Sequence, residues 1–199
     1  MTAMTTTPDL TASGTPRLLV LSASVRPTSA ARPVADWVAG QARARGGFEV
    51  VEVDLGELAL PFLDEPEYAS SGIYTHQHTR DWSAVVDAAD AFLFVLPMYN
   101  AGFTAPFKNA LDFLYREWQG KPVGLVSYSG GPSGGAPAAE MLRPVLDRIG
   151  MLPAERSVAI PFIGELVDGG AGGFRAPEGL AQELAGVLDE VAAKAAVTA

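Results

Sequence analysis

Short apolar runs alternate with helical apolar periodicity along most of this chain. Runs of strand length occur at Arg17 to Ala23, Phe48 to Val53, Ala91 to Pro97, Pro122 to Tyr128 and Ser157 to Pro161. Between them apolar residues recur at intervals of three and four, as at Val34, Trp37 and Val38, which is the spacing of one helix face. The pattern therefore predicts strands and helices in alternation.

Further helices are expected after the later strands as well. They cover the region near Trp82 to Ala89, with Thr79 as N-cap, and the segments Thr104 to Trp118, Pro137 to Ile149 and Pro177 to Val197. Pro144 lies inside one of these helices and predicts a kink there. Five strands alternating with five helices predict an α/β fold, a doubly wound five-stranded parallel sheet of order 2-1-3-4-5 with helices on both faces.

Length and composition favour one domain. The 199 residues are 48% hydrophobic, which is enough for one core, whereas two halves would be small. Residues 1–16 are rich in Thr, Ser, Ala and Pro and predict a disordered leader, so the single domain is expected over residues 17–199.

Composition also excludes several kinds of partner and site. The chain has no cysteine, so disulfides, thiolate metal sites and cysteine nucleophiles are absent, and a cytoplasmic location is expected. A net charge of -9 opposes binding to nucleic acid. The longest apolar stretches are strand-sized and far shorter than the roughly 20 residues that span a bilayer, so no membrane partner is expected. An anionic cofactor is still compatible, because backbone amides and a local arginine act at short range.

Ligands of open α/β sheets bind beyond the carboxyl ends of the strands, so the loops after the first, third and fourth strands are expected to converge. The first loop, Ser22 to Ser29, places hydroxyls and the Arg26 guanidinium just before a helix N-terminus. This is the chemistry of an anion site. The segment by itself is equally compatible with ordinary N-capping by Ser29 and a solvated Arg26.

The second and third loops have equally unusual compositions. Tyr99 and Asn100 follow a buried strand and are suited to flank a planar ring, although Asn100 and Gly102 are also typical of a turn with unusual dihedral angles. The loop Ser127 to Gly135 holds four glycines, which either let a ligand approach main-chain amides or form a flexible structural loop. Neither a dinucleotide fingerprint nor a P-loop is present, so a mononucleotide is the expected ligand.

These three loops resemble the NADPH-dependent FMN reductase family of the flavodoxin-like fold, which includes flavin, quinone and azo reductases. The family motifs G-S-x-R, P-E-Y-N and K-N-A-[LIF]-D here read Ala23 to Arg26, Pro97 to Asn100 and Lys108 to Asp112. The resemblance covers about Arg17 to Ile149. Ala23 replaces the usual glycine and Met98 the usual glutamate, and these departures bear on substrate preference.

The resemblance implies FMN as cofactor and NADPH or NADH as electron donor. It implies that Ser24, Arg26 and Ser29 hold the FMN phosphate, that Pro97, Met98, Tyr99 and Asn100 line the ribityl chain and flavin ring, and that Ser129, Gly130 and Gly131 face the pyrimidine edge of the ring. Hydride would pass from the nicotinamide to bound FMN and on to a flavin, quinone, azo compound or similar small acceptor. No catalytic side chain is expected, because the flavin performs the hydride transfer.

Two alternatives remain open, namely a flavin-binding electron carrier and a flavoenzyme dedicated to one biosynthetic step. By analogy with the family, a homodimer or homotetramer is expected. The long connection from Asp54 to Thr79 is expected to pack over the site or a partner subunit. Its Tyr74, His76 and His78 lack an obvious third ligand, so no metal site is predicted. The aromatic set Phe113, Tyr115 and Trp118 favours core or dimer contacts over cofactor stacking.

Overall fold

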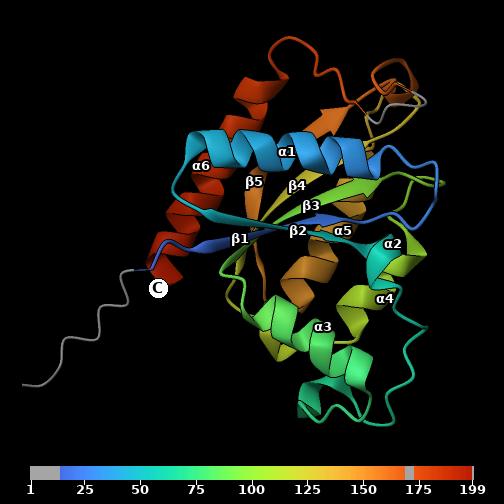
Figure 1. Cartoon of the computed structure of the whole chain (residues 1–199), viewed down its shortest axis with the longest axis vertical. Helices are drawn as coiled ribbons and strands as arrows, with labels where there is room; N and C mark the ends of the chain where they lie inside the picture. The colour runs from blue at the N-terminus through green and yellow to red at the C-terminus, as the bar shows by residue number, and fades with distance from the viewer. Residues whose placement is uncertain (1–13, 169–172, 199) are drawn as a thin grey trace, which may run out of the picture.

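A computed structural model describes residues 14–168 and 173–198 and places a five-stranded parallel sheet at the centre of the molecule (Figure 1). The strands are β1 (Arg17–Ser22), β2 (Glu49–Asp54), β3 (Ala91–Pro97), β4 (Pro122–Tyr128) and β5 (Leu152–Ile160). Their order, β2-β1-β3-β4-β5, confirms the predicted topology. The predicted leader, residues 1–16, lies outside the described residues except for 14–16.

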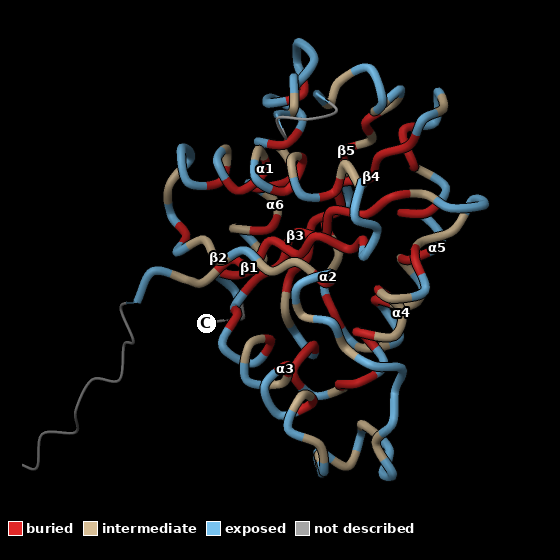
Figure 2. The backbone as a smooth tube through the Cα atoms, turned by 45° about the vertical axis from the view of Figure 1, so that its right-hand side comes forward, coloured by how far each residue is buried: buried red, intermediate tan, exposed pale blue. Residues whose placement is uncertain are grey.

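Helices cover both faces of the sheet, as the alternating pattern predicts. Helices α1 (Ala31–Arg45) and α6 (Leu180–Thr198) lie on one face, and α3 (Gln77–Asp87), α4 (Ala105–Asp112) and α5 (Ala136–Arg148) lie on the other (Figure 1). Because successive strand residues point to opposite faces, Leu18 and Val20 pack in the α1/α6 layer, whereas Leu19 and Leu21 pack in the other. The three central strands β1, β3 and β4 are accordingly the most continuously buried part of the chain, whereas the edge strand β2 has no buried residue (Figure 2).

Several boundaries differ from those predicted. Strand β5 begins at Leu152 rather than Ser157, because exposed polar residues, Glu155 and Arg156, interrupt the apolar run of this edge strand. The predicted helix Thr104 to Trp118 ends at Asp112 and gives way to a 3-10 turn, η2 (Arg116–Trp118). Phe113 and Trp118 are fully buried, in agreement with a core role. Helix α5 runs through Pro144.

The predicted N-cap of α3 is wrong. This helix begins at Gln77, and Thr79 is buried in its first turn. The N-cap is His76, and the Glu65 carboxylate of the preceding loop accepts hydrogen bonds from the amides of Thr75 (2.7 Å) and His76 (2.9 Å), just before the helix. A charged acceptor at this end of the helix also complements the helix dipole.

The connection between β2 and α3 contains two short elements, α2 (Leu55–Leu58) and the 3-10 turn η1 (Ala69–Ser71). Its last part is anchored by the buried carboxylate of Glu117, which accepts hydrogen bonds from Tyr74 Oη (2.9 Å) and Ser83 Oγ (2.6 Å). The connection is therefore tied to both α3 and η2. Within the described residues, no helix is long and apolar enough to cross a membrane.

Candidate functional site

The loops after β1, β3 and β4 meet at the carboxyl end of the sheet, as expected. The amide of Ala23 donates to the carbonyl of Val95 at 2.9 Å, which continues the pairing of β1 with β3 beyond the end of β1. The amide of Met98 donates to the carbonyl of Tyr128 at 3.1 Å, which joins the β3–α4 loop to the end of β4. These bonds hold the three candidate loops side by side.

The β1–α1 loop forms a polar cradle at the start of α1. Ser24 is buried, and its Oγ accepts a hydrogen bond from the Arg26 amide at 3.3 Å. The Arg26 guanidinium donates to Thr28 Oγ1 at 3.3 Å. Ser29 Oγ accepts from the Ala31 amide at 3.1 Å, so Ser29 satisfies the first amide of α1, although the N-cap position itself is Ala30.

A cavity of about 310 Å³ opens beside this cradle. Its lining comes from the β1–α1 loop, the ends of β3 and β4, and the segment after β5, and consists of Arg26, Thr28, Ser29, Ala30, Tyr99, Tyr128, Ile163, Gly164 and Val167. In the part of the chain that the structure describes, the amides of Thr28 and Ala30 donate to no acceptor. Unpaired amides beside a guanidinium and a helix N-terminus suit an anion such as a phosphate.

The β3–α4 loop makes a tight turn that presents Tyr99 to the cavity. The amide of Tyr99 donates to the carbonyl of Gly102 at 2.9 Å, and the reverse bond measures 3.0 Å. Asn100 (φ 51°) and Ala101 (φ 66°) both adopt the left-handed conformation. The turn hypothesis is thus correct for Asn100, but the second unusual residue is Ala101 and not Gly102. Pro97 is buried at the end of β3.

The four glycines of the β4–α5 loop form two pairs that differ in how closely other atoms approach them. A Cβ on Gly134 would lie 2.7 Å from the backbone of Ala159, and one on Gly135 would lie 2.9 Å from the backbone of Tyr128, so close packing demands this pair. A Cβ on Gly130 or Gly131 would meet nothing within 4 Å. This second pair faces open space.

The amides of that open pair are also available to a ligand. Gly130 and Gly131 donate no amide hydrogen bond to any described residue. The preceding Ser129 is fixed, since its amide donates to Ile160 at 3.2 Å and its hydroxyl donates to the carbonyl of Gly131 at 3.2 Å. An ordered loop with unpaired amides fits the polar edge of a flavin ring.

Tyr128 is a site residue that the sequence reasoning left without a role. It ends β4 and is only 4% exposed, and its Oη lies 2.8 Å from Ser29 Oγ. Burial raises the pKa of its phenol well above the ordinary value, although the bond to Ser29 and the charge of Arg26 oppose the rise. The feature of the sequence that could have identified it is a tyrosine hydroxyl at the end of the apolar strand β4.

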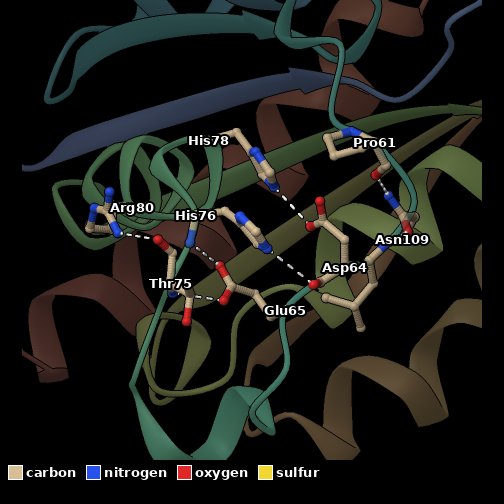
Figure 3. A network of polar contacts seen from close by, with 9 residues as sticks. Pro61, Asp64, Glu65, Thr75, His76, His78, Arg80 and Asn109 are labelled. Carbon is tan, nitrogen blue, oxygen red and sulfur yellow. Dashed lines mark hydrogen bonds and ion pairs between the residues drawn. The ribbon is translucent and has the colours of Figure 1, made fainter.

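The loop after α2 is folded back onto α4 and α3 (Figure 3). Asn109, in the motif Lys108 to Asp112, accepts from the Leu63 amide at 2.9 Å and donates to the Pro61 carbonyl at 2.7 Å. Further along, His78 Nε2 lies 2.9 Å from Asp64 Oδ1. The rings of His76 and His78 stack with their centroids 5.2 Å apart. The two histidines therefore help to hold this loop in place.

A second cavity, of about 420 Å³, is lined in part by Val25. Most of its walls are apolar, and they come from the β1–α1 loop, α2 with the residues after it, and the start of α4: Val25, Leu55, Gly56, Ala59, Leu60, Pro61, Phe62, Pro106 and Asn109. Because the amide group of Asn109 is engaged by Pro61 and Leu63, this cavity suits an uncharged apolar ligand.

A flavodoxin-like sheet whose carboxyl end presents an anion cradle and an open glycine edge defines a mononucleotide-binding α/β protein. Comparison of the sequence with known proteins identifies the family within this class. The profile of the NADPH-dependent FMN reductase family matches residues 16–165, and the chain belongs to that family. It is a family of oxidoreductases that use FMN and a nicotinamide cofactor.

Individual relatives agree with this placement. The chain is 42% identical over 133 residues to an NAD(P)H-dependent FMN reductase of Schizosaccharomyces pombe, and this alignment covers 66% of each chain. It is 31% identical over 154 residues to an NAD(P)H-dependent FMN reductase of a Nectria species, covering 73% of this chain and 75% of the relative. The alignments thus span about two thirds to three quarters of these relatives.

A solved structure shares the fold. The flavoenzyme NAD(P)H:(acceptor) oxidoreductase of Paracoccus denitrificans superposes with a TM-score of 0.73 at 21% identity, covering 92% of this chain and 98% of that one.

Proposed function

We propose that this protein is an NAD(P)H-dependent FMN oxidoreductase that passes electrons to a small acceptor. The observation that carries the proposal is the cavity that the β1–α1 loop lines together with Tyr99 and Tyr128, with an arginine, hydroxyls and unpaired amides at its α1 end. Family membership supports it. When bound, FMN supplies the hydride chemistry, and the side chains hold and orient it.

The proposal assigns FMN-binding roles to the ten residues that the sequence predicts. Ser24, Arg26 and Ser29 bind the phosphate, Pro97, Met98, Tyr99 and Asn100 line the ribityl chain and ring, and Ser129, Gly130 and Gly131 meet the pyrimidine edge. The unpaired amides of the open glycine pair would stabilise negative charge that develops at that edge upon reduction. Thr28 and Ala30 add amides to the phosphate site.

Two spectroscopic measurements test the proposal. The purified protein should carry flavin absorbance or gain it when titrated with FMN, and a chain that binds no FMN would refute the assignment. Anaerobic mixing of the FMN-bound protein with NADPH and, separately, NADH should bleach the flavin rapidly. Binding without bleaching by either nucleotide would indicate a flavin-binding electron carrier instead.

Quinones are the acceptor class that the structure favours. The apolar cavity beside Val25 suits an uncharged ring, and one relative, 33% identical over 129 residues, is a quinone reductase of Pseudomonas putida. Turnover with menadione is expected to exceed turnover with free FMN and with an azo dye under identical conditions. Negligible turnover of all three would favour a flavoenzyme dedicated to one biosynthetic step.

A homodimer or homotetramer is part of the same proposal. Large apolar side chains are exposed on the loop between α2 and α3, with Phe62 84%, Tyr68 87% and Ile73 61% accessible. Exposed apolar residues gathered on one segment are typical of a contact surface. Light scattering coupled to gel filtration should give at least twice the mass of one chain, and a monomer would contradict this part. A cytoplasmic location remains a prediction from the sequence.

A further inference from the structure

We propose that Tyr128 is a positioning residue that orients Ser29, so that the two hydroxyls together direct one proton into the cradle and favour a phosphate over an uncharged group. This inference rests on the proposed FMN site. It assigns a role to a residue outside the three family motifs, and the hydroxyl pair joins the end of β4 to the start of α1.

The hydroxyls of Ser29 and Tyr128 bond to each other and also border the cavity. Ser29 Oγ lies 2.8 Å from Tyr128 Oη and accepts a hydrogen bond from the Ala31 amide at 3.1 Å. Both residues line the 310 Å³ cavity, together with Arg26. The serine oxygen is therefore placed between a helix amide, a buried phenol and the space that a phosphate would occupy.

Counting protons shows what this arrangement offers to a ligand. Each hydroxyl carries one proton and two lone pairs. If Tyr128 donates to Ser29, the serine oxygen has both lone pairs occupied and its own proton is free. If Ser29 donates to Tyr128, the phenol proton is free. In either case one proton remains for the cavity, which suits a ligand whose oxygens only accept, as those of a phosphate do.

The phenol of Tyr128 is held in place firmly enough to orient the Ser29 hydroxyl. Its side chain is almost fully buried, and the main chain of Tyr128 is fixed by the bond from the Met98 amide at 3.1 Å. The close approach of Gly135 restricts it from the other side. Since burial raises the phenol pKa, the hydroxyl keeps its proton at neutral pH.

The test compares FMN with riboflavin, which lacks the phosphate. The flavin-free full-length chain is titrated with each flavin, and quenching of flavin fluorescence gives the two dissociation constants. Tyr128→Phe and Ser29→Ala are each expected to reduce the preference for FMN over riboflavin by about tenfold, the scale of one hydrogen bond to a charged group. The double variant should lose little more than either single variant, because the hydroxyls act as a pair.

Two controls separate this role from a general loss of structure. Tyr68→Phe removes a hydroxyl from an exposed tyrosine outside the cavity and should leave the preference unchanged. Ser29→Thr keeps the hydroxyl and should restore the preference that Ser29→Ala loses.

The outcomes distinguish the two hypotheses. A wild-type chain that binds no FMN refutes the proposed function. A wild-type chain that binds FMN, with an unchanged preference in Tyr128→Phe, overturns only the role of Tyr128. Equal weakening of FMN and riboflavin would overturn it too, because the phosphate would then not be the group recognised. If Tyr128→Phe does not fold, equal preferences in Ser29→Ala and Ser29→Thr overturn the inference, and a lower preference in Ser29→Ala alone supports it.

Discussion

Thr104 Oγ1 donates a 2.7 Å hydrogen bond to the carbonyl of Ala23, which joins the start of α4 to the β1–α1 loop. The same oxygen accepts from the Phe107 amide at 3.3 Å, so one buried side chain caps α4 and fixes the cradle. Ala23 is fully buried, and its φ lies outside the left-handed region. Alanine therefore replaces the family's glycine without backbone strain.

Loss of the cradle's guanidinium should weaken FMN binding. Arg26→Ala is expected to reduce the affinity by about 1.5 to 3 kcal/mol, the range for hydrogen bonds to a charged group. Calorimetric titration with FMN measures the change. Arg45→Ala is the matched control, since Arg45 lies at the far end of α1, the helix that follows the cradle, and pairs with Asp189 at 2.8 Å. An equal effect of both variants would show that the phosphate lies elsewhere.

Asn109 should be the main clamp of the loop that it contacts. Asn109→Ala removes the bonds to Pro61 and Leu63 and is expected to lower the free energy of unfolding by about 1 to 3 kcal/mol. Urea unfolding measures this loss, and amide exchange of residues 61–65 should quicken. Lys108→Ala breaks only an exposed pair with Asp112 and should cost about 0.5 kcal/mol or less. Unaltered exchange in Asn109→Ala would contradict the clamp.

Glu65 should make stability depend on pH in the acid range. Burial acts to raise the pKa of its carboxyl, but the nearby Thr79 hydroxyl and the two amides outweigh burial and lower the pKa from 4.5 to about 2. A carboxyl with a depressed folded-state pKa stabilises the fold above pH 4.5, and this stabilisation is lost as the pH falls toward 2. The wild type should therefore exceed Glu65→Gln in unfolding free energy at pH 6, with the difference shrinking between pH 4.5 and 2.

The exposed Glu67→Gln is the control for that series. A Glu65→Gln difference that does not shrink between pH 4.5 and 2 would mean that the amides of Thr75 and His76 do not stabilise the charged carboxylate.

The left-handed conformation of Ala101 predicts an unusual gain from glycine. Ala101→Gly should relieve steric strain at φ 66° and raise the unfolding free energy by about 1 kcal/mol. Ala185→Gly, at an exposed position within α6, should lower it by about 1 kcal/mol. Thermal and urea unfolding of the two variants compare the signs, and a loss in both would contradict a strained turn.

The sequence by itself determined the sheet order and the meeting of the three candidate loops at one end of the sheet. Apolar periodicity and the alternation of strands and helices are local signals, and a parallel sheet of this kind brings the loops after β1, β3 and β4 to one edge. The start of α4 was also predicted to within one residue, since the helix expected from Thr104 begins at Ala105. These features depend on neighbours along the chain.

Only the tertiary structure decided which side chains act together. Glu65, not Thr79, supplies the acceptor at the start of α3, because it reaches the amides of Thr75 and His76 from a distant point of the loop. Tyr128 meets Ser29 across 99 residues of sequence. Gly134 and Gly130 look alike in the sequence, yet one packs against β5 and the other borders open space. Such contacts depend on the relative placement of separate elements, which no local pattern records.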